Sequence, residues 1–116
     1  MTTRDRLPNR RPHEAVDFAF SREPHGFGLD YTFGLGRYPD GRLGEVFLDC
    51  HKLSSAATDE ARDAAVTISV ALQHGMAIET LRHAVARFDD GRPCSLIGRL
   101  ADVLTEYEAA RSPPAA

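Results

Sequence analysis

The side chains that could do acid–base, thiol or metal chemistry are scattered through this sequence. The histidines are His13, His25, His51, His74 and His83. They form no HxxxH or HExxH pair, so the close ligand spacing of a zinc site is missing. Cys50 and Cys94 lie far apart with no CxxC pair, and we expect free thiols in a reducing compartment. We therefore predict no bound metal, no cofactor and no catalytic residue.

A glycine-rich stretch, FGLGRYPDG, occupies residues 33–41 and superficially resembles a phosphate-binding loop. Such a loop must pass from a strand into a helix N-terminus, where backbone N–H groups converge on the anion. Here Pro39, Asp40 and Gly41 predict a reversal of the chain instead, because proline presets the first corner and glycine accepts a positive φ. We predict a hairpin at this point and no nucleotide cradle.

The clearest chemical signal is an arginine-rich N-terminus. Residues 1–12 carry Arg4, Arg6, Arg10 and Arg11 against a single acid, Asp5, while the whole chain has a net charge of −3. Guanidinium groups bind carboxylates and phosphates in a planar, bidentate way. We interpret residues 1–15 as an extended basic arm that acts as an electrostatic docking segment. The alternative is that a compositional bias of the genome alone supplies these arginines.

The first half of the chain is predicted to form the strands that position these residues. Apolar residues alternate with polar or small ones in Val16–Phe20, Leu29–Leu35 and Leu43–Cys50, which is typical of strands with one buried face. The turn at Pro39–Gly41 joins the second and third strands. We predict an antiparallel sheet of about three strands, packed against a three-helix C-terminal half in an α+β fold.

Helical spacing of apolar residues follows the strands. The segment Thr58–Gly75 is apolar on nearly every side and predicts a central helix, capped at Thr58 or Asp59, with acids in its first turn and a glycine at its end. A second helix is predicted from about Ile78 to Phe88, and a third is capped by Ser95. No internal repeat of useful length is evident.

Length and composition bound the class of protein. The 116 residues provide for one domain, which we place at residues 16–108, with 109–116 as a disordered tail. Apolar residues make up 42% and charged residues 27%, which is ordinary for a soluble protein. No apolar run approaches the ~18 residues that a membrane helix needs, and no apolar segment follows the N-terminal arginines as in a signal peptide. We expect a cytoplasmic protein without a membrane partner.

Five stretches in succession resemble the TSCPD domain. They are RLPNRR (6–11), GRYPDGRLGEVFL (36–48), ARDAAVTISVALQHG (61–75), MAIETLRHAV (76–85) and GRPCSLIGRLADVL (91–104). That domain is found at the C-terminal end of adenosylcobalamin-dependent (class II) ribonucleotide reductases and as short free-standing bacterial proteins. The sequence departs from the family at its name-giving Cys-Pro segment, which occurs here only in altered order at residues 92–95. The CxxC tail and the catalytic barrel of the full-length reductases are missing.

The resemblance implies an accessory or regulatory module that docks on a ribonucleotide reductase or another nucleotide-metabolism enzyme and reduces no ribonucleotide by itself. The alternative is a small dimeric regulator that binds a nucleotide or nucleic acid through the arginine arm. A third hypothesis makes Cys50 and Cys94 a redox relay.

A set of charged residues at the arm and the turns is predicted to bind the partner. It comprises Arg4, Arg6, Arg10, Arg11, Asp40, Arg42 and Arg92. A sheet of two or three short strands also leaves unpaired backbone groups at its edges, and pairing edge to edge or face to face with a second copy would satisfy them. We therefore expect a homodimer.

Overall fold

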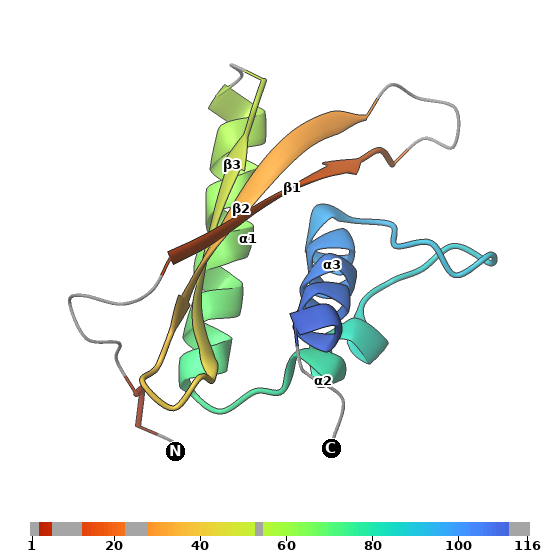
Figure 1. Ribbon diagram of the computed structural model, residues 1–116. Helices are drawn as coiled ribbons and strands as arrows, with labels where there is room; N and C mark the ends of the chain where they lie inside the picture. The colour runs from red at the N-terminus through yellow and green to blue at the C-terminus, as the bar shows by residue number, and fades with distance from the viewer. Residues whose placement is uncertain (1–2, 6–12, 23–27, 53–54, 112–116) are drawn as a thin grey trace. The chain divides into compact units, whose positions relative to one another are not determined.

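The computed structural model describes residues 3–5, 13–22, 28–52 and 55–111 (Figure 1). In chain order the elements are β1 (His13–Phe20), β2 (Leu29–Arg37), β3 (Leu43–Cys50), α1 (Ser55–Gln73), α2 (Ile78–Ala84) and α3 (Leu96–Arg111). The predicted α+β fold is confirmed, with a three-stranded antiparallel sheet and three helices. The chain divides into two compact units, residues 1–76 and 77–116.

The sheet of the first unit has the strand order β1-β2-β3, and its apolar face follows the predicted alternation. Phe18 lies opposite Tyr31, and Leu35 lies opposite Val46. The rings of Phe18 and Tyr31 stack with their centres 5.4 Å apart. Phe33 and Leu35 are completely buried, so the core of this unit lies on the middle strand. Strand β1 begins at His13, three residues before the predicted Val16, because residues 13–15 continue the pairing with Gly34–Gly36.

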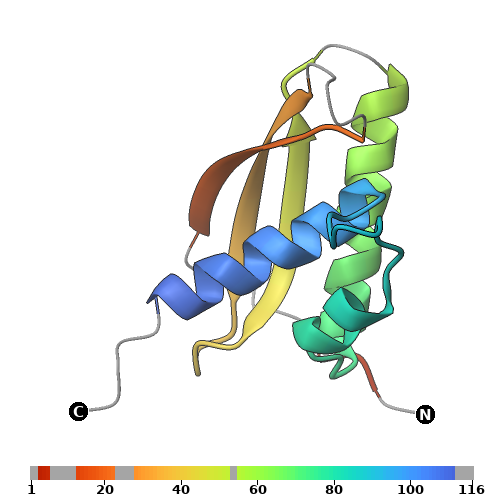
Figure 2. The same cartoon turned by 90° about the vertical axis from the view of Figure 1, so that its right-hand side faces the viewer.

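Helix α1 packs along β3, the strand nearest to it in Figure 2. Half of its buried positions are alanines, and these small side chains let the helix and the strand approach closely. The helix begins at Ser55, so the predicted caps at Thr58 and Asp59 are wrong and no acid occupies its first turn. Gly75 has a φ of +94° and follows the end of the helix, as its position predicts. Although the segment is apolar on nearly every side, not every apolar side chain is buried, since Val66 is 60% exposed.

The second unit joins α2 to α3 through a tight turn. Helix α2 ends at Ala84 rather than near Phe88, because Val85 is extended and the chain passes directly into the turn. The predicted cap at Ser95 is confirmed, since its Oγ accepts a hydrogen bond from the Gly98 N–H over 3.2 Å. A Cβ at Gly98 would lie 2.9 Å from the Cβ of Pro93, so only glycine permits this close approach. None of the described helices is long and apolar enough to cross a membrane.

Candidate functional site

The hairpin turn, Arg37–Arg42, holds two residues predicted to bind a partner, Asp40 and Arg42. The Tyr38 N–H donates to the Arg42 carbonyl over 2.9 Å, and the glycine of the turn has a φ of +94°. The Asp40 carboxylate accepts the Arg42 N–H at 3.0 Å and the Arg42 Nε at 2.7 Å. These backbone and side-chain hydrogen bonds lower the pKa of Asp40. The Arg42 guanidinium lies 4.5 Å from the Tyr38 ring centre, so its orientation is fixed.

The second turn, Arg87–Arg92, repeats this arrangement contact for contact in the second unit. The Phe88 N–H donates to the Arg92 carbonyl over 2.8 Å, and the glycine of the turn has a φ of +89°. The Asp90 carboxylate accepts the Arg92 N–H at 3.0 Å and the Arg92 Nε at 2.7 Å. The Arg92 guanidinium lies 4.9 Å from the Phe88 ring centre. Hydrogen bonds from the Arg92 side chain and backbone lower the pKa of Asp90 as well.

In each turn the leading arginine fastens the segment to its own unit. Its Nη1 donates to the carbonyl of the turn glycine, over 3.2 Å from Arg37 and 3.1 Å from Arg87. Arg37 is 4% exposed and also donates from Nε to the Glu14 carboxylate over 2.6 Å. Arg87 donates to both carboxylate oxygens of Asp102, over 2.8 and 2.9 Å, and thereby lowers the pKa of that carboxyl. Each turn therefore has an anchored arginine at its start and a more exposed one at its end.

This repeat is a feature that the sequence analysis missed. The segments RYPDGR and RFDDGR begin 50 residues apart. They share an arginine, an aromatic residue, one variable position, and then Asp-Gly-Arg. A search for long repeats overlooks six residues, but a comparison of the sequence with itself at that offset would have revealed them.

Of the predicted basic arm, residues 13–15 form the start of β1, and residues 3–5 lie against the rest of the first unit. The Arg4 Nε donates to Gln73 Oε1 over 2.5 Å, and the Asp5 N–H donates to the Gln73 carbonyl over 2.9 Å. The Asp5 carbonyl accepts a hydrogen bond from the Tyr38 hydroxyl, and its carboxylate lies 3.3 Å from Arg42 Nη2. Arg4 and Asp5 thus connect Gln73, at the end of α1, to the hairpin turn.

The other predicted partner-binding residues are placed differently. Arg92 belongs to the second unit. Arg6, Arg10 and Arg11 lie outside the described residues.

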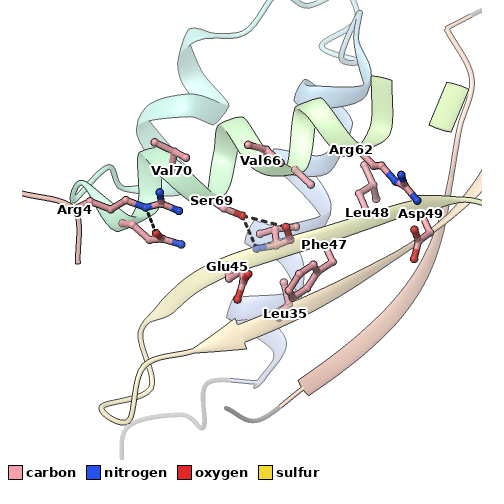
Figure 3. A pocket seen from close by; sticks show the side chains of 13 residues that line it. Arg4, Leu35, Glu45, Phe47, Leu48, Asp49, Arg62, Val66, Ser69 and Val70 are labelled. Carbon is pink, nitrogen blue, oxygen red and sulfur yellow. Dashed lines mark hydrogen bonds between the residues drawn. The ribbon is translucent and has the colours of Figure 1, made fainter. Parts of the chain in front are cut away.

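An open groove of about 730 Å³ lies between β3 and α1 in the first unit (Figure 3). Its strand side carries Glu45, Phe47 and Asp49, and its helix side includes Arg62 and Val66. Phe47 is 42% exposed and Val66 60% exposed, and among the described residues these are the exposed large apolar side chains. Both line this one groove. The sequence analysis treated Val66 only as part of an apolar helix surface, so it gave no indication of the groove.

The bottom of this groove holds a second feature that sequence reasoning missed. The Ser69 Oγ accepts the Val46 N–H over 2.8 Å and donates to the Val46 carbonyl over 3.1 Å. Gln73, one helical turn further on, donates from Nε2 to the Gly44 carbonyl over 2.8 Å. Both side chains are buried. Helix α1 therefore pairs with the outward-facing backbone of β3 at Gly44 and Val46, where an edge strand would otherwise be open.

A short hydrogen-bond chain links the middle of β1 and β2 to His51, the residue that follows β3. The Thr32 Oγ1 donates to Asp17 Oδ1 and lies 2.7 Å from His51 Nε2. In the part of the chain that the structure describes, no three His, Cys, Asp or Glu side chains are grouped so as to hold a metal ion. Cys50 and Cys94 are free thiols, as expected.

Comparison with known proteins finds similarity to vitamin B12-dependent ribonucleotide reductases. The protein of that name from Bradyrhizobium diazoefficiens is 30% identical over 95 residues, covering 80% of this chain and 7% of the relative. The one from Agrobacterium fabrum is 33% identical over 76 residues, covering 66% and 6%. The one from Streptantibioticus cattleyicolor is 31% identical over 110 residues, covering 90% and 17%.

The chain is therefore homologous to a segment of these reductases, and the greater part of each relative has no counterpart in its 116 residues. No protein-family model matches the chain. No solved structure matches it either.

Proposed function

We propose that this protein is a noncatalytic accessory module, related to the C-terminal TSCPD domain of B12-dependent ribonucleotide reductases. In this proposal it docks on a ribonucleotide reductase or on another enzyme of nucleotide metabolism. The observation that carries the proposal is the homology to a short segment of much longer proteins named as reductases. In those proteins the matched segment is part of the reductase chain. A related domain is therefore expected to keep a surface that can bind a reductase.

The turns supply the docking chemistry in this proposal. The side chains of Arg42 and Arg92 are 61% and 43% exposed, yet each is held by an aspartate and lies over an aromatic ring. An arginine that is already ordered loses little conformational entropy on binding. Its planar guanidinium suits carboxylates, and arginine is enriched among the residues that dominate interface energies. Each turn by itself therefore suits a partner surface that presents Asp or Glu side chains.

Affinity purification tests the proposal. The tagged chain is recovered from a lysate of its own organism, and the proteins that accompany it are identified by mass spectrometry. We expect a ribonucleotide reductase or another nucleotide-metabolism enzyme to be enriched. The double variant Arg42→Ala/Arg92→Ala should recover it about tenfold less, because two interface arginines are lost. Recovery of the chain alone would refute the function.

A matched variant separates the function from the surface assigned to it. Arg22 is exposed and lies outside both turns, so Arg22→Ala should leave the recovery unchanged. Arg42→Lys keeps the charge but loses the planar fork, and we expect it to reduce recovery as well. Far-UV circular dichroism confirms that each variant is folded. Equal recovery with the wild type and the double variant would leave the docking function standing and show that the turns are not its surface.

A further inference from the structure

We propose that a second copy of this chain packs face to face on the groove between β3 and α1. The proposal goes beyond the docking function, because it concerns a different surface and a different partner. Three features of the first unit support it. They are the two exposed apolar side chains in the groove, the hydrogen bonds that close the outer edge of β3, and the opposite charges on the two sides of the groove.

The exposed apolar side chains meet at a single place. Phe47 points from β3 and Val66 from α1, and both line the groove shown in Figure 3. Phe47 lies opposite Gly34 in the sheet, so no side chain from the neighbouring strand stands across from its ring. Isolated exposed apolar residues are ordinary on a protein surface, but two that converge in one groove mark a contact surface.

The hydrogen bonds at the outer edge of β3 limit how a second copy can bind there. A partner that added a strand to this edge would need the carbonyl of Gly44 and the N–H and carbonyl of Val46. Those groups are already hydrogen-bonded to the buried side chains of Gln73 and Ser69. Pairing edge to edge is therefore blocked along this stretch, and the contact must be made by side chains across the groove. Face-to-face packing satisfies that requirement.

The charges make the groove complementary to itself. Acids lie on the strand side, at Glu45 and Asp49, whereas arginines lie on the other side, at Arg62 on the helix and Arg4 near its end. A two-fold axis sets the same surface of both copies against each other. With that axis near Phe47 and Val66, the strand-side acids of one copy face the arginines of the other. A second copy thus fits the groove in both its apolar and its charged parts.

The first test measures the mass in solution of the full chain. Sedimentation equilibrium at micromolar concentrations should give twice the chain mass of 12.7 kDa. Val66→Glu places a charge at the centre of the contact and should raise the dissociation constant at least about tenfold. The control Thr67→Glu adds the same charge at the next position of α1, where Thr67 is exposed and does not line the groove. It should leave the dissociation constant unchanged.

The second test mixes two chains with reversed charges. Asp49→Arg and Arg62→Glu should each weaken self-association about tenfold, because each homodimer then sets two like-charged pairs together. An equimolar mixture should restore a heterodimer, since the new Arg faces the new Glu and the unchanged Arg62 faces the unchanged Asp49. Asp89→Arg, an exposed change in the second unit, is the charge control and should not weaken association.

The outcomes that would overturn the proposal are distinct. A monomer mass for the wild type at a few hundred micromolar excludes the dimer and points to a different partner for the groove. A dimer that survives Val66→Glu and both charge reversals, with all variants folded by circular dichroism, places the interface elsewhere. Weakened homodimers that fail to combine in the mixture refute the two-fold arrangement.

Discussion

Replacing Ser69 by alanine removes the side chain that closes the outer edge of β3 at Val46. The hydroxyl serves two backbone groups at once, accepting the Val46 N–H over 2.8 Å and donating to the Val46 carbonyl over 3.1 Å. Val46 is 3% exposed and Ser69 is 7% exposed, so water cannot freely replace the lost partner. A buried polar group left without a partner costs about 1–3 kcal/mol. With two such groups and some local relaxation, we expect the free energy of unfolding to fall by about 2–3 kcal/mol.

Urea denaturation followed by far-UV circular dichroism measures this loss. Ser69→Thr retains the hydroxyl and should recover most of the stability that Ser69→Ala loses. The matched control is Thr67→Ala, which removes a hydroxyl from the same helix where Thr67 donates only to the exposed Asp63 carbonyl, over 2.7 Å. We expect that control to cost less than about 0.5 kcal/mol. Equal losses in Ser69→Ala and Thr67→Ala would show that closing the strand edge does not stabilise the fold.

Two further predictions concern the core and the turns. Burial raises the pKa of Tyr31 to about 12, whereas the pKa of a tyrosine in the unfolded chain is about 10. Its contribution to stability is therefore complete below pH 10 and is lost as the pH rises toward 12; urea titrations at pH 8 and 11 should show the decline, and Tyr31→Phe should lessen it. Gly41 and Gly91 have φ values of +94° and +89°, and a Cβ at either position would meet only open space, so alanine there should cost about 1–2 kcal/mol from backbone strain alone. Similar thermal shifts in the two variants would agree with this, and an unchanged melting temperature would contradict it.

The sheet could be predicted because its signals are local. Alternating apolar residues in β2 and β3, with Pro39–Gly41 between them, predict a hairpin. The structure confirms both its turn and the buried face of each strand. The boundaries of α1 and α2 were less accurate, since helix ends depend on neighbouring contacts. Phe88, for example, continues the helical spacing of α2 but bonds to Arg92 across the second turn.

The candidate surfaces could be predicted only in part. Asp40, Arg42 and Arg92 stood out as charged residues at turns, and the structure shows how each is held. The roles of Ser69 and Gln73 could not be inferred, because their partners on β3 are more than twenty residues away in sequence. A polar residue on an apolar helix face is normally taken as an exposed position, and only the tertiary structure shows it bonded to the edge of a sheet.

The two matched turns have a consequence for how structure is encoded in this chain. One turn connects two long strands, and the other lies between two helices, where Arg87 and Pro93 form an isolated antiparallel bridge. Both turns close with the same hydrogen bonds, the same Asp–Arg ion pair and the same glycine conformation. The short bridge around the second turn is therefore enough pairing for the same six-residue pattern to close in the same way as it does between two full strands. We therefore expect this pattern to form the same turn when it is placed between the paired strands of an unrelated hairpin.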